Sequence, residues 1–131
     1  MRLPWLIAGA AVAALAAALV VARPGHATRH PDPRPGITAE RVLPPGMVPH
    51  TPGSAEAYAA ARVVPAVLDG VYCHCNCSRT LGHRSLLTCF ESDHAASCDI
   101  CMGEATTAAR LAQAGASLQQ IRAAIDRQFG S

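Results

Sequence analysis

The chain has 131 residues, which allows one small domain once its ends are discounted. Its formal net charge is +2, and its positive side chains are scattered arginines, which excludes a strongly basic nucleic-acid-binding surface. Half of the residues are hydrophobic, but many of these are alanines, and aromatic residues make up only 4%. A core built mainly of Ala, Leu and Val is small, and a small core usually needs a disulfide or a bound metal.

Residues 1–22 begin with Arg2 and then continue as a charge-free hydrophobic stretch. As a helix this stretch would span about 30 Å, the thickness of a bilayer core. Small residues near Ala22 and Ala27 resemble signal-peptidase sites, so the segment is expected to be a cleaved signal peptide or an uncleaved membrane anchor. Either alternative predicts that the rest of the chain lies outside the cytoplasm, in the periplasm or at the cell surface.

Residues 23–53 carry eight prolines. Proline removes a backbone donor and fixes φ, which disfavours both helices and central strands. We therefore expect an extended, mobile and disordered linker here. Its histidines, His26, His30 and His50, are expected to be solvated.

Residues 54–131 predict a small, Cys-rich, all-α domain. A helix is expected from Ser54 to Val64, because Ser is a good N-cap and Pro65 interrupts the helical pattern. Proline at a first helical position can start a second short helix over 65–69. Short helical segments are also expected over 85–90 and 94–96.

The last part of the chain predicts a helical hairpin. A long helix should run from Ser97 or Cys98 to Gln113 and stop at Gly115. Ser117 and Gln120 have the capping-box spacing, and they predict a final helix from Leu118 to about Phe129. No alternating pattern of strand length occurs, so the fold class is all-α.

The chemistry of the chain is concentrated in six cysteines that fall within 29 residues. Three alternate along the chain, so an extended backbone would direct their sulfurs to one side. Two more are three residues apart and would share a helix face. The six are Cys73, Cys75, Cys77, Cys89, Cys98 and Cys101.

These cysteines favour a metal site. Thiolates are soft ligands that suit Cu(I) best, and they also suit Zn(II). Six sulfurs exceed the four that one tetrahedral ion needs, which indicates a thiolate-bridged cluster or two separate sites. His83 and His94 are candidate ligands that would complete or flank it. His74 should face away from the thiols, and Met102 is more typical of a core residue than of a ligand.

Two alternatives remain open. The even cysteine count and an oxidising compartment also suit a disulfide framework, in which each alternating cysteine pairs with a distant partner. The sequence Cys98-Asp99-Ile100-Cys101 at a helix start also suits dithiol redox chemistry, although no thioredoxin-like βαβ pattern accompanies it. No paired carboxylates, nucleophile motif or phosphate loop indicates an enzyme.

Several spaced elements of the chain resemble the bacterial CYCXC family, relatives of the PCYCGC-motif lipoproteins. The elements that match are Cys73-His74-Cys75-Asn76-Cys77, Gly82-His83-Arg84-Ser85-Leu86-Leu87, Cys89-Phe90, Asp93-His94-Ala95, Cys98-Asp99-Ile100-Cys101 and the final helix. The resemblance implies an extracytoplasmic protein, often membrane-tethered, whose thiols matter for metal binding or redox chemistry. His74 stands where that family has tyrosine, and the N-terminus lacks a lipidation cysteine.

The sequence therefore predicts an extracytoplasmic protein that binds Cu(I) or Zn(II) through its six cysteines, with His83 and His94 beside them. It would sequester the metal or transfer it to a partner protein. Its membrane contact would be the first segment if that segment is not cleaved, and no nucleic-acid partner is expected.

Overall fold

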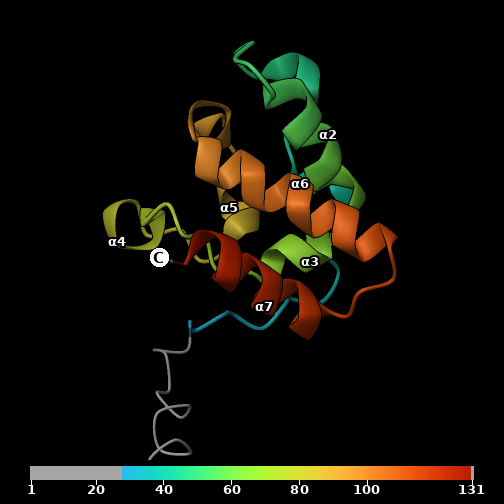
Figure 1. Cartoon of the computed structure of the whole chain (residues 1–131). Coiled ribbons are helices and arrows are strands. Elements are labelled where there is room, and N and C mark those ends of the chain that lie inside the picture. The colour runs from blue at the N-terminus through green and yellow to red at the C-terminus, as the bar shows by residue number, and fades with distance from the viewer. Residues whose placement is uncertain (1–27, 131) are drawn as a thin grey trace, which may run out of the picture.

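The computed structural model describes residues 28–130, and Figure 1 shows the chain. The hydrophobic segment 1–22, for which a signal peptide or an anchor was predicted, lies outside the described residues. Among the helices of residues 28–130, none combines the length and the apolar character needed to cross a membrane.

The described residues form helices and loops and contain no strand, which confirms the all-α prediction. Two short 3-10 helices come first, and a third precedes the longest α-helix. In chain order the elements are η1 (Ala39–Arg41), η2 (Pro45–Met47), α2 (Ser54–Val63), α3 (Pro65–Asp69), α4 (Cys77–Thr80), α5 (Leu86–Phe90), η3 (His94–Ser97), α6 (Asp99–Gln113) and α7 (Leu118–Phe129).

Local sequence signals set most helix ends. Pro65 occupies the first position of α3, where its missing N–H is not needed. Gly115 has a φ of 86° in the turn after α6, a conformation that glycine adopts without steric cost. Ser117 accepts from the Gln120 N–H while the Gln120 side chain accepts from the Ser117 N–H, which completes the predicted capping box of α7.

The core lies where α2, α5 and α7 pack against α6. Figure 1 shows α6 crossing α2, with α7 returning beneath it as the second arm of the predicted hairpin. Alanines on α2 and α6 allow close approach, and the largest buried rings are those of Tyr58 and Phe90, whose centroids are 4.8 Å apart. This edge-to-face ring contact fixes α5, and with it Cys89, against α2.

Residues 28–53 differ from the extended, mobile linker predicted for residues 23–53. Val42 and Val48 are buried in the core, and the Leu43 N–H donates to the Phe90 carbonyl. The prolines do keep this segment out of long helices. They do not prevent packing, because apolar side chains between them find a surface to cover. We call residues 28–48 the strap, and Figure 1 shows them running past α7 and α3.

A buried carboxylate attaches the strap to the domain. Asp69, at the end of α3, is fully buried and accepts from the Arg34 backbone N–H at 2.7 Å and from its guanidinium at 2.7 Å. Arg84 donates to the same carboxylate at 2.9 Å. Burial raises the pKa of Asp69, but the hydrogen bonds from Arg34 and the charge of Arg84 outweigh it and hold the pKa below its usual value.

Candidate metal centre

Three stretches of the chain bring the six thiols together. Cys73 and Cys75 lie in the loop after α3, and Cys77 is the first residue of α4. Cys89 is on α5. Cys98 is the N-cap of α6, where its sulfur accepts from the Cys101 N–H at 3.3 Å, and Cys101 lies in the first turn of that helix.

The cysteine loop turns rather than running as a straight extended segment. Asn76 has a φ of 68°, and it is the one non-glycine residue with a positive φ in the described part of the chain. Asparagine tolerates this left-handed conformation better than other side chains do. The reversal starts α4 at Cys77 and directs that thiol toward α5 while Cys73 and Cys75 face α6.

Five of the six sulfurs fall into two close groups. The Sγ–Sγ distances are 3.3 Å for Cys73–Cys75, 3.4 Å for Cys73–Cys101 and 3.5 Å for Cys75–Cys101. Cys77 and Cys89 approach to 3.3 Å on the other side. A disulfide needs a separation of about 2.05 Å, and all six cysteines are free thiols.

Seven residues combine into three overlapping sets of four, and within each set the ligand atoms lie within 4.8 Å of one another. Cys75 belongs to all three sets, so it is the hub of the arrangement. The sets are Cys73, Cys75, Cys89 and Cys101; Cys75, Cys77, Cys89 and His94; and Cys75, His94, Cys98 and Cys101. Four donors at such spacing match the ligand number of a tetrahedral soft-metal site.

The two histidines singled out from the sequence both lie at this centre, but in different positions. His94 Nε2 is 3.9 Å from the Cys75 sulfur and joins two of the sets. His83 belongs to none of them. Its Nδ1 is 3.3 Å from the Cys89 sulfur and its ring packs edge-on against that of His94. Burial and the neighbouring charge of His94 lower the pKa of His83, which favours its neutral form.

His74 lies away from the thiols, as predicted, and its partner was missed. Glu104 of α6 is fully buried and accepts from the His74 backbone N–H at 2.9 Å and contacts its ring Nδ1 at 2.6 Å. The other ring nitrogen lies 3.2 Å from Asp126 of α7. Burial raises the pKa of Glu104, and the hydrogen bonds from His74 oppose that rise.

The contact between His74 and Glu104 attaches the cysteine loop to α6 at the residue that lies between Cys73 and Cys75. The sequence does contain a weak signal for it. Glu104 lies on the alanine-rich face of α6 that turns inward, where an acidic residue is out of place.

The thiols differ in acidity according to their surroundings. The hydrogen bond with Cys101, together with burial, raises the pKa of Cys73. For Cys75, burial raises the pKa, but hydrogen bonds with His94, Cys77 and Cys73 outweigh it and lower the pKa to about 6. Cys75 is therefore the thiolate available at neutral pH, the form that binds metals.

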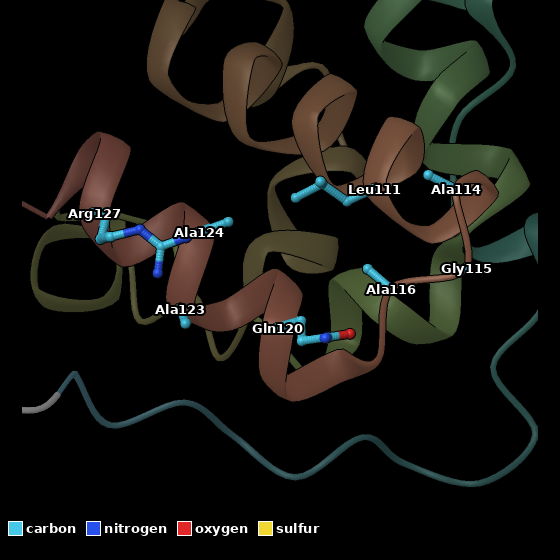
Figure 2. A pocket seen from close by; sticks show the side chains of 8 residues that line it. All are labelled: Leu111, Ala114, Gly115, Ala116, Gln120, Ala123, Ala124 and Arg127. Atoms are coloured by element: carbon cyan, nitrogen blue, oxygen red, sulfur yellow. The ribbon is translucent and has the colours of Figure 1, made fainter.

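The centre is separate from a hollow on the surface of the described residues. That hollow, of about 550 Å³, lies between the end of α6 and α7, and small residues such as Ala116 and Ala123 line it together with Arg127 (Figure 2). It contains no cysteine or histidine. The thiol centre is thus a packed cluster of side chains that does not open into this hollow.

These features define a small all-helical protein whose cysteine-rich centre could hold a metal ion. The chain belongs to the family described as "Protein of unknown function with PCYCGC motif", whose model matches residues 21–131. This membership confirms the resemblance found in the sequence. No curated protein and no solved structure matches the chain.

The motif that gives the family its description falls on the cysteine loop. In this chain the six positions read Tyr72-Cys73-His74-Cys75-Asn76-Cys77, so the three cysteines are kept and the other three residues differ. Asn76 stands at the glycine of the motif, and its positive φ is the conformation that glycine and asparagine share. The glycine of the motif therefore has a structural reason, the reversal that separates Cys75 from Cys77.

Proposed function

We propose that the protein binds soft metal ions, Cu(I) in preference to Zn(II), outside the cytoplasm. It sequesters the metal or transfers it to a partner protein by exchange among neighbouring thiolates. The observation that carries this proposal is the convergence of six free thiols and His94 into three overlapping four-ligand sets.

The donor set favours Cu(I). Sulfur supplies six of the seven donor atoms, and soft thiolates select Cu(I) over harder ions. A set of three thiolates and one imidazole also satisfies Zn(II), so zinc is the second candidate. Because the three sets share Cys75, two ions bound together would share its sulfur, as in a thiolate-bridged cluster.

The extracytoplasmic location rests on the hydrophobic segment 1–22, which is typical of a signal peptide or an anchor. Bound metal would protect the thiols there, because metal-bound thiolates are less available for oxidation. The partner would be a second thiol-bearing protein that accepts or delivers the metal, and the membrane is a partner if the segment is retained.

A competition titration tests this proposal. Anaerobically reduced protein is mixed with Cu(I) buffered by bicinchoninate. Loss of the absorbance of the Cu(I)–bicinchoninate complex reports transfer of Cu(I) to the protein. We expect at least one Cu(I) per chain, with full binding retained in the control variant His50→Ala, an exposed histidine far from the thiols in sequence. Reduced protein with six titratable thiols and native helix content that takes up neither Cu(I) nor Zn(II) would contradict the proposal.

Dithiol redox chemistry is the second candidate, and one contact favours it. The Cys98 sulfur accepts from the Cys101 N–H at 3.3 Å in the first turn of α6, so the two cysteines of the Cys-x-x-Cys motif meet at one helix end. This function predicts a reversible Cys98–Cys101 couple in a thiol–disulfide buffer, which Cys98→Ser abolishes. A metal-free protein that shows such a couple and binds no Cu(I) would replace the first proposal by this one.

A further inference from the structure

Two of the three ligand sets differ in depth while sharing half of their members. We define the outer site as Cys75, His94, Cys98 and Cys101, and the inner site as Cys73, Cys75, Cys89 and Cys101. Cys75 and Cys101 belong to both. An ion could therefore pass from one site to the other by exchanging two ligands while two remain attached.

The ligands that differ between the sites differ in exposure. His94 and Cys98 of the outer site are half-buried, as is the shared Cys75. Cys73 and Cys89 of the inner site are 3% and 0% exposed. A metal complex arriving from solvent can therefore contact the outer ligands, whereas it cannot reach Cys73 or Cys89 directly.

The distances make the passage short. The shared sulfurs of Cys75 and Cys101 are 3.5 Å apart, and Cys73 lies 3.3 Å and 3.4 Å from them. These three sulfurs form a compact triangle, of which Cys75 and Cys101 belong to both sites and Cys73 to the inner site alone. An ion held by Cys75 and Cys101 needs no movement of a helix to gain Cys73.

The donor chemistry gives the passage a direction. The outer site contains one imidazole nitrogen, whereas the inner site is made of four sulfurs. Cu(I) prefers thiolate to imidazole, and the inner sulfurs are shielded from water, so the inner site should hold Cu(I) more tightly.

We infer that Cu(I) is captured at the outer site and stored at the inner site, with Cys75 and Cys101 bound throughout and with Cys73 and Cys89 replacing His94 and Cys98. This inference rests on the proposed function and adds an order of events to it. After the passage only His94 and Cys98 become free again, because Cys75 and Cys101 remain attached to the stored ion.

The steps balance without a change of oxidation state. Cu(I) arrives bound by two small-molecule thiolates; bonds to two cysteines replace the two bonds to the carrier, and the third cysteine and His94 add to the ion. The carrier thiolates take up protons as they leave, and further cysteine protons go to water. In the inward step, Cys98 regains a proton as Cys73 loses one, the Cys89 proton goes to water, and His94 leaves as a neutral base.

Thiol labelling of the unmodified chain tests the inference. Protein with no metal and protein with one equivalent of Cu(I) are pulsed with N-ethylmaleimide, and labelling at Cys75 and Cys98 is measured by peptide mass spectrometry. We expect Cu(I) to slow labelling at Cys75 at least tenfold and to change that at Cys98 by less than about twofold. Equal protection of Cys75 and Cys98 would place the ion at the outer site and overturn the inference. Protection of neither would instead contradict the proposed function.

A matched pair of variants tests the order by kinetics. Cys98→Ser should slow Cu(I) uptake and Cu(I) release to excess bathocuproine disulfonate by a similar factor, about tenfold, and leave the affinity unchanged, because the outer site lies on both paths and Cys98 does not hold the stored ion. Cys89→Ser should take up Cu(I) at the normal rate and release it at least tenfold faster. Uptake by Cys98→Ser at the wild-type rate would overturn the inference. Helix content by circular dichroism checks both variants, and if Cys89→Ser does not fold, Cys98→Ser and the labelling ratio decide.

Discussion

Asn76 shows how much one backbone conformation contributes to the centre. Its φ of 68° reverses the chain between Cys75 and Cys77, so that the two thiols reach different neighbours, His94 and Cys89. The Asn76 side chain is exposed and makes no capping hydrogen bond. Its role is therefore conformational, and the backbone requirement should decide which residues the position accepts.

Asn76→Gly and Asn76→Val form a matched pair that tests this requirement. Glycine adopts positive φ freely, so we expect a change in the free energy of unfolding within about 0.5 kcal/mol. The β-branched valine should cost about 1–2 kcal/mol or more and weaken Cu(I) binding. Urea unfolding of the reduced, metal-free protein measures both. Equal stability of the two variants would show that the left-handed conformation is dispensable.

Asp69 predicts a pH dependence of stability. Its folded pKa lies below its ordinary value of about 3.9, so its contribution is fully present above pH 4. That contribution is lost as the pH falls through the lower, folded pKa. We expect the wild type to lose stability steeply below pH 4.

Asp69→Asn should remove this part of the pH dependence. At pH 7 we expect a loss of about 2–4 kcal/mol, toward the low end because Arg34 and Arg84 are partly exposed. Urea unfolding between pH 3 and pH 7 measures both effects, with exposed Asp99→Asn as the control. A variant whose stability falls below pH 4 as steeply as that of the wild type would contradict the assignment to Asp69.

At the scale of elements, the helices whose ends carry short-range signals were the predictable ones. Pro65, Gly115 and the Ser117–Gln120 pair act within a few residues, so α3, α6 and α7 could be found from the sequence. The gathering of thiols was also predictable, because six cysteines in 29 residues have little room to separate.

Contacts between distant segments were not predictable in the same way. Glu104 meets His74 across 30 residues, and Asp69 meets Arg34 across 35. No local pattern identifies the partner of such a residue, although the inward position of Glu104 on α6 marks that residue as unusual. The strap was missed for a related reason: five prolines dominate its composition, while its two buried valines are single residues among them.

The capping box of α7 gives a prediction at this scale. Ser117→Ala removes the oxygen that accepts from the Gln120 N–H, and we expect a loss of about 1 kcal/mol. The exposed Gln119→Ala on the same helix is the control and should be nearly neutral. The midpoint of urea unfolding measures both, with an unchanged m-value. A Ser117→Ala midpoint equal to that of Gln119→Ala would show that the cap contributes nothing.

On the scale of the whole molecule, the strap makes the domain larger than residues 54–131. It contributes two core valines and the arginine that pairs with Asp69. Arg122 of α7 reinforces it by donating to the Pro31 carbonyl at 2.8 Å, and also donates to the Gly70 carbonyl at 2.8 Å. The strap, α3 and α7 are thus connected through a few polar contacts.

Two fragments test the strap. The fragment 28–131 should have the higher melting temperature. The fragment 54–131 should melt more than about 10 °C lower or fail to fold. Burying Val42 and Val48 contributes about 1.5–3 kcal/mol each, and 1 kcal/mol corresponds to about 4–8 °C in a domain of this size. Thermal unfolding by circular dichroism measures the difference. Equal melting temperatures would show that the strap only rests on the domain.

The attachment of His30 sets how far the centre can stand from a membrane. Its Nδ1 accepts from the Tyr72 N–H, one residue before Cys73, and its Nε2 contacts Asp126 at 3.1 Å. Only residues 23–29 then separate the hydrophobic segment from a fixed point beside the thiols. Seven residues reach at most about 25 Å. If the segment is retained as an anchor, His30 stays within about that distance of the lipid surface, and a protein that exchanges metal with the nearby thiols must work close to the membrane.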